Sequence, residues 1–120
     1  MEIVYSKEVI YMKSILHCNK WISEEEFRDN TDKYVTINPV ENKEKILVHL
    51  KQREIEAVCS KPVKDPFTKK LIYFSTCEYE EGEYGWDNLY IYLFEKYNLR
   101  LDDNFIINVL DNKYSNNGKR

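Results

Sequence analysis

Glycine, histidine, cysteine and long apolar runs are all scarce in this chain of 120 residues, and each scarcity excludes a class of function. The three glycines, Gly82, Gly85 and Gly118, cannot build a phosphate-binding loop, because none follows a strand pattern at the required spacing. No apolar run approaches the ~20 residues of a membrane-spanning helix. The opening MEIVYSKEV lacks the basic and apolar parts of a secretory signal. We therefore expect a cytoplasmic protein with no membrane contact.

The few cysteines and histidines predict no disulfide framework, metal site or cofactor. Cys18, Cys59 and Cys77 are odd in number and widely spaced, which favours reduced and buried thiols. His17 and His49 add possible zinc ligands, but the spacing matches neither C-x-x-C nor H-x-x-x-H.

Enzyme activity is not expected, because a reactive group needs a partner that orients it. His17 and Cys18 are chain neighbours, and such neighbours point apart on a helix. His49 falls within an amphipathic helical pattern, where we expect it at the surface or boundary. A small hydrolase that uses His49 or Cys59 is the weaker alternative.

Composition indicates one domain. Apolar residues make up 42% and charged residues 32%, which is typical of a globular protein. The net charge of −3 and the pI of about 5.5 argue against a general nucleic-acid binder. We expect residues 1–114 to form the domain and residues 115–120 (SNNGKR) to be a frayed tail.

Helix start signals recur along the chain. Ser23 and Glu26 have capping-box spacing, which predicts a short helix ending near Asn30. Asn38 followed by Pro39 predicts a second helix over 39–52. Residues 33–37 are expected to be extended. The N-terminal run 3–16 is compatible with helix or strand, and we favour helix.

The second half predicts a hairpin and two closing helices. Runs rich in β-branched and aromatic residues at 54–63 and 70–79 flank a turn at 64–68. Asp87 can cap an aromatic-rich helix, and Asp102 can cap the last one. The fold class is therefore α+β, in which about four to five helices pack mainly on one face of a small antiparallel hairpin or sheet.

Residues 78–87 (EYEEGEYGWD) mix carboxylates with aromatic rings and contain no basic residue. Such a loop can imitate a phosphate backbone with its bases and attract a basic partner protein. The simpler interpretation is the solvated rim of a hairpin whose rings pack inward. The predicted partner-binding residues are Glu78, Glu80, Glu81, Glu83, Tyr84 and Asp87.

A basic cluster surrounds the predicted hairpin turn. Its members are Lys61, Lys64, Lys69 and Lys70. They could touch RNA or phosphate, but protection of the hairpin edge explains them equally well. We expect no direct nucleic-acid binding.

Residues 45–101 resemble small bacterial immunity proteins, which are encoded beside toxins of contact-dependent growth inhibition and other polymorphic-toxin systems. The resemblance lies in the order of a helix, a strand, a D-P-F-T turn, a second strand and the stretch EGEYGW, followed by L-x-x-Y-x-x-x-K-Y-N-L-x-L. At Asp102-Asp103 the chain departs from the usual pattern, which has an apolar residue or Pro before the last helix.

The resemblance implies a protein that binds one cognate toxin domain and blocks its active site or substrate entry. Together with the acidic segment 78–87, this makes a nuclease the expected toxin. It transfers a role and no site, because these families share no catalytic residues and their contact surfaces differ. The alternative is a non-enzymatic adaptor or regulatory protein of a phage or mobile element that binds a host protein. The sequence leaves the partner's identity and the oligomeric state open.

Overall fold

Two small sheets and five helices make up residues 12–111, the part of the chain that the computed structural model describes. This architecture confirms the predicted α+β fold class. In chain order the elements are β1 (Lys13–Ser14), α2 (Glu24–Asp29), α3 (Thr31–Tyr34), α4 (Lys43–Gln52), β2 (Ala57–Cys59), β3 (Val63–Lys64), β4 (Leu71–Tyr73), β5 (Thr76–Glu81), β6 (Tyr84–Asp87), α5 (Asn88–Tyr97) and α6 (Asp103–Leu110).

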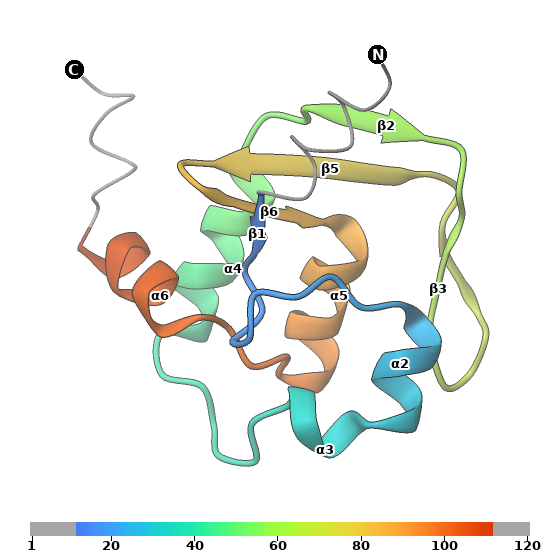
Figure 1. Cartoon of the computed structure of the whole chain (residues 1–120), viewed down its shortest axis with the longest axis horizontal. Helices are drawn as coiled ribbons and strands as arrows, with labels where there is room; N and C mark the ends of the chain where they lie inside the picture. Colours follow the sequence, from blue (N-terminus) through green and yellow to red (C-terminus); the bar gives the residue numbers. More distant parts are fainter. Residues whose placement is uncertain (1–11, 112–120) are drawn as a thin grey trace.

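The larger sheet has the strand order β1–β6–β5–β2. β1 runs parallel to β6, whereas β5 pairs antiparallel with both β6 and β2. β3 and β4 form a separate antiparallel hairpin. Figure 1 shows β2, β5 and β6 at the top of the view, α4 and α5 below them, α6 at the left, and α2 beside β3 at the right. Within the described residues, β1 and β2 are the edge strands of the larger sheet.

The core lies between one face of this sheet and the helices. Trp86 on β6 is fully buried, with its ring centroid 5.5 Å from that of Phe105 on α6. Its indole N–H donates to the Leu50 carbonyl oxygen of α4 over 3.4 Å. From α5, Leu93 and Phe94 join the same cluster. Removing such large apolar side chains from water is the main stabilising contribution in a domain of this size.

Three of the predicted helix starts are confirmed. Ser23 accepts a hydrogen bond from the Glu26 amide over 3.1 Å and begins α2, which ends at Asp29. Asp87 caps α5 through the Tyr90 amide, and Asp102 caps α6 through the Phe105 amide. Each side chain satisfies one of the amides that have no partner in the first turn, so these sequence signals acted locally.

Three other predictions were wrong or partly wrong. The helix predicted over 39–52 begins at Lys43, and Asn38 does not cap it. Of the residues expected to be extended, Lys33 and Tyr34 belong to α3, whereas Val35 makes an isolated bridge to Leu99. The favoured N-terminal helix is wrong for Lys13–Ser14, which form β1. The rest of that run up to residue 11, and the predicted tail at 115–120, lie outside the described residues.

The predicted hairpin between 54–63 and 70–79 is present but divided. Each run contributes two strands, so that β3 pairs with β4 while β2 pairs with β5. Asp65 organises the turn between β3 and β4, where its carboxylate accepts the amides of Phe67 and Thr68 over 2.8 and 2.9 Å. The turn predicted at 64–68 is therefore confirmed.

The same carboxylate ties the turn to α5. Tyr92 and Tyr97 donate their hydroxyls to Asp65 over 2.5 and 2.6 Å, and Asp65 is only 1% exposed. Burial pushes the pKa of Asp65 upward, but the hydrogen bonds from the two hydroxyls and the two amides outweigh it and hold the pKa well below its ordinary value. Asp65 is thus a buried, ionised anchor between the hairpin and the core.

Candidate partner-binding face

The acidic segment 78–87 is an antiparallel hairpin, as in the simpler of the two interpretations, and not an open loop. β5 and β6 pair Tyr79 with Trp86 and Glu80 with Gly85, and Gly82 at the turn has a φ of 62°. That left-handed conformation suits glycine because no side chain crowds the backbone. Since alternate residues of a strand point to opposite faces, the hairpin divides the segment into two sets.

The set that faces the helices is built into the core. Tyr79 stacks on Trp86, with ring centroids 5.9 Å apart and planes tilted by 9°. Tyr84 is only 2% exposed and donates its hydroxyl to Asp102 over 3.0 Å. Tyr84 is therefore a structural residue, which corrects its prediction as part of the partner-binding surface.

Glu81 is also turned inward. Its carboxylate lies 2.5 Å from Nε2 of His49 on α4 and 2.8 Å from a guanidinium nitrogen of Arg53. The side chains of Glu81 and His49 are 9% and 6% exposed. Glu81 thus belongs to a charged cluster between β5 and α4, and the expectation of a surface or boundary position for His49 was wrong.

Asp87 has a position between the two sets. It caps α5, and it lines a hollow of about 170 Å³ together with Glu78 and Lys61. Burial raises the pKa of Asp87 to about 6, with a smaller upward contribution from Glu78, while the Tyr90 amide and Lys61 act in the opposite direction. One carboxylate oxygen of Asp87 caps the helix and the residue is half-buried, so Asp87 adds charge beside the outer face.

The opposite face of the hairpin carries the remaining predicted residues. Glu78 and Glu80 are exposed there, and neither forms an ion pair with another described residue. Glu83 is exposed at the turn, where it pairs with Lys13 over 3.4 Å. Of the six predicted residues, these three present carboxylates to solvent.

A groove of about 410 Å³ lies on this face, and we call it the outer-face groove. Gly85 forms its floor, where the missing side chain leaves room for Met12 and Trp21: a Cβ atom at this position would lie 2.9 Å from Met12 Cγ and 3.3 Å from Trp21 Cζ2. Glu78 and Glu80 also line the groove. It therefore combines an aromatic ring, a thioether and two carboxylates.

Trp21 is held in place although its side chain is partly exposed. Its indole N–H donates to the Met12 carbonyl oxygen over 3.1 Å, and its ring lies 5.5 Å from that of Tyr90. The residue is 45% exposed, so part of a fixed aromatic surface faces the solvent. Sequence reasoning missed Trp21, because its place in the groove depends on contact with Gly85, far along the chain.

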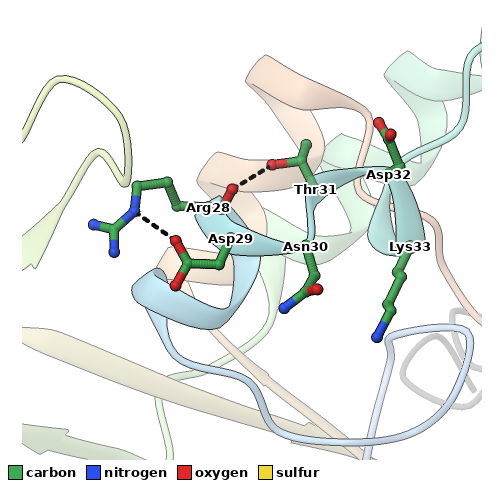
Figure 2. Close-up of a pocket in the computed structure, with 6 residues that line it drawn as sticks. All are labelled: Arg28, Asp29, Asn30, Thr31, Asp32 and Lys33. Carbon is green, nitrogen blue, oxygen red and sulfur yellow. Dashed lines mark hydrogen bonds and ion pairs between the residues drawn. The ribbon is translucent and has the colours of Figure 1, made fainter.

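A second hollow of about 420 Å³ lies at the junction of α2 and α3 (Figure 2). Arg28 is paired with Asp29 over 3.1 Å, and Thr31 donates its hydroxyl to the Arg28 carbonyl oxygen. Figure 2 shows the Asp32 and Lys33 side chains pointing in opposite directions. The polar groups that line this hollow are thus paired with one another or point apart, so they do not converge on a ligand.

The residues named for possible chemistry do not come together. His49 contacts Glu81, whereas Cys59 pairs with Thr76 at the other end of β5. At roughly 3.3 Å per residue, those two positions of β5 are about 16 Å apart. Cys59 and Cys18 are exposed, contrary to the expected burial, and Cys77 is half-buried. In residues 12–111 no group of three potential ligands is arranged to hold a metal ion.

The basic cluster Lys61, Lys64, Lys69 and Lys70 is exposed on the strands and turn of the β3–β4 region, as the sequence predicted. None of the helices described between residues 12 and 111 is both long and apolar enough to cross a bilayer. Comparison with protein-family models, curated proteins and solved structures finds no match. The resemblance to immunity proteins therefore stays a prediction.

Proposed function

We propose that this protein is a cytoplasmic immunity protein that binds a cognate toxin domain and blocks its active site or substrate entry. A nuclease is the toxin that the surface chemistry favours. The single observation that carries the proposal is the outer-face groove, in which a fixed and exposed indole lies beside two carboxylates without a cationic partner among the described residues. The resemblance of residues 45–101 supplies the role.

The charge of this face suits a nuclease. Enzymes that bind nucleic acid present lysine and arginine to the phosphate backbone. Glu78, Glu80 and Glu83 would attract such a surface from a distance and hold it in register. The inhibitor would then cover the residues that the nucleic acid needs.

Trp21 gives the proposed contact an anchor. Partly exposed Trp residues that are fixed before binding commonly contribute most of the binding energy of an interface, because little side-chain freedom is lost. Met12 adds a polarizable surface that adapts to the shape of a partner. We expect the toxin to place an apolar or cationic side chain against this indole.

Inhibition by stoichiometric binding, without catalysis, is part of the proposal. It is supported by the separation of His49 from Cys59 and by the commitment of Glu81 and Asp87 to internal contacts. These groups contribute to the fold and are not directed together at a bound substrate.

The first test identifies the partner. The protein is expressed in its native host with an affinity tag, captured proteins are identified, and a captured toxin domain is expressed with and without it in a sensitive strain. Protection by the wild-type protein supports immunity. Capture of a host protein with no toxin and no protection favours the adaptor alternative and refutes immunity.

The second test examines the groove by association kinetics with the captured toxin. E78K/E80K should slow association by about tenfold or more at low salt and reduce its salt dependence, because rim charges act mainly on the association rate. Trp21→Ala should raise Kd by about thirtyfold through faster dissociation. The matched controls are E41K/E44K and Phe74→Ala, which change exposed residues elsewhere. Unchanged kinetics for both groove variants would remove this face from the proposal while leaving the immunity function standing.

A further inference from the structure

The chemistry of the outer-face groove restricts the side chain that a partner can place in it. Glu78 and Glu80 are two residues apart on β5, so their side chains leave the same face of the sheet about 7 Å apart. Both are exposed, and both line the groove. One wall of the groove therefore carries two carboxylates.

Trp21 lies beside these carboxylates. In the hairpin register Glu80 is opposite Gly85, and the Cβ positions of opposed residues in an antiparallel pair are about 4.5–5.5 Å apart. A Cβ atom at Gly85 would in turn lie 3.3 Å from Trp21 Cζ2. The indole and the Glu80 carboxylate therefore border the same part of the groove. The hydrogen bond from the indole to the Met12 carbonyl oxygen fixes the ring there.

The groove lacks a cation of its own. None of the described residues that line it is basic. Glu78 and Glu80 form no ion pair with any residue of the range 12–111. An apolar side chain that filled the groove would remove these carboxylates from water without compensation, which costs free energy. A cationic side chain would compensate both charges and is the favoured occupant.

Arginine fits this arrangement better than lysine. A guanidinium is planar, so it can stack on an indole face while its N–H groups, which lie in the plane, donate to carboxylates at its sides. A lysine ammonium is a compact and strongly hydrated point charge, which has no flat face to place on the ring. Two carboxylates beside one exposed indole therefore match the planar group.

We propose that the outer-face groove is a receptor for one arginine side chain of the partner, with the guanidinium stacked on Trp21 and hydrogen-bonded to Glu78 and Glu80. The inference rests on the proposed function for the source of this arginine, which is a phosphate-binding residue on the basic surface of the toxin. Occupation of the groove would then withdraw from the nucleic acid a residue that the toxin uses to hold it.

The test measures the receptor without the toxin. The isotope-labelled full-length protein is titrated with N-acetyl-arginine amide and followed by NMR through the indole N–H signals of its two tryptophans. The Trp21 signal should shift, with a Kd of about 1–10 mM for this single side chain. The Trp86 signal should not shift, because its indole is buried and donates to Leu50, so it also verifies the fold. Trp21→Phe assigns the two signals.

Two related probes separate the effects of charge and shape. N-acetyl-citrulline amide has nearly the shape of the arginine probe without its charge, and should bind at least about tenfold more weakly. N-acetyl-lysine amide keeps the charge without the planar group, and should bind at least about threefold more weakly. A lysine or citrulline probe that binds as tightly as the arginine probe would overturn the proposal, as would an unshifted Trp21 signal.

Variants locate the binding site. E78Q/E80Q should weaken binding of the arginine probe at least about tenfold, whereas the matched control E41Q/E44Q, which removes two exposed charges elsewhere, should leave it unchanged. Equal binding by the two double variants would refute the groove as the receptor. 

The outcome of this titration is distinguishable from that of the proposed function. A captured toxin against which the protein protects cells, together with a failed arginine titration, would refute the receptor and leave immunity standing. Arginine binding in the absence of any toxin would support the receptor and refute the proposed source of the arginine.

Discussion

The two faces of the β5–β6 hairpin contain similar residues, but one face is packed against the helices and the other is exposed to solvent. On the helix side, Tyr79, Trp86 and Glu81 are stacked, buried or bonded to α4. On the other side, Glu78 and Glu80 stand in solvent beside a groove. An acidic, aromatic segment therefore does not define one surface. Its register divides it into a part that builds the fold and a part that is available to a partner.

This difference also assigns the two tryptophans. Trp86 and Trp21 line the same groove, but Trp86 lies in the strand and is fully buried, whereas Trp21 comes from the segment before α2 and is partly exposed. A substitution of Trp86 should therefore reduce the stability of the fold, whereas a substitution of Trp21 should mainly weaken the proposed partner binding. The following predictions test that separation, beginning with the largest expected effect.

Trp86→Ala should cost about 3–5 kcal/mol of the free energy of unfolding, because it removes the largest buried side chain and leaves a cavity. Trp21→Ala should cost less than about 1.5 kcal/mol, since much of its ring is already in water. Urea denaturation followed by circular dichroism measures both. Equal losses of unfolding free energy in the two variants would contradict the assignment of Trp86 to the core and Trp21 to the exposed surface.

Asp65→Asn extends the comparison to a buried carboxylate outside the hairpin. It should cost about 2–3 kcal/mol at pH 7, because four donors lose an ionised acceptor. The pKa of Asp65 is lowered in the folded state, so its contribution is complete above the ordinary value of about 3.9 and is lost as the pH falls below it. The difference in free energy of unfolding between wild type and variant should narrow from pH 7 to pH 3. A difference that stays constant would contradict an ionised, hydrogen-bonded Asp65.

Glu81→Gln and Glu80→Gln compare neighbours on one strand. Glu81→Gln should cost about 1–3 kcal/mol, because it weakens the acceptor of His49 and Arg53, of which Arg53 keeps some access to water. Glu80→Gln should change the free energy of unfolding by no more than about 0.5 kcal/mol. Urea denaturation of both variants at pH 7 measures the two losses of stability. A larger loss for Glu80→Gln would contradict the placement of Glu81 on the buried face and Glu80 on the exposed face.

Asp87→Asn should change the free energy of unfolding by about 1 kcal/mol, in the stabilising direction. Asn also caps helices, and it removes a charge whose burial raises the pKa of Asp87 to about 6. The penalty of this charge is complete above pH 6 and fades as the pH falls toward the ordinary value of about 3.9, because between these two values the folded protein takes up the proton while the unfolded chain stays ionised. The variant should thus be more stable by about 1 kcal/mol at pH 7.5 and equal to wild type near pH 4.5. A loss of stability at pH 7.5 would mean that the ionised carboxylate makes the better cap.

Local signals predicted the parts of the fold that depend on neighbouring residues. The caps at Ser23, Asp87 and Asp102 and the turn at Asp65 act within a few residues, so the sequence contained them. The start of α4 did not follow its local signal. Val40 packs against the core, and Lys43 bonds Glu95 and Asn98 at the end of α5, so tertiary contacts set where the helix begins.

The candidate face was only partly predictable. The two-residue turn at Gly82-Glu83 between alternating residues is a hairpin signal, and period-two alternation would have placed Tyr84 and Glu81 on one face. The burial of His49 follows from its contact with Glu81, which no spacing in the sequence indicates. The position of Trp21 likewise requires the parallel pairing of β1 with β6, which depends on the whole fold.

One hydrogen atom at Gly85 keeps the slot between Met12 and the opposite carboxylates open. A methyl group there would lie 2.9 Å from Cγ of Met12 and 3.3 Å from Cζ2 of Trp21, so both side chains would have to shift. Alanine at this position would therefore displace the Met12 and Trp21 side chains that line the outer-face groove. Gly85→Ala would thus reshape, by a single carbon atom, the surface that we propose for partner binding.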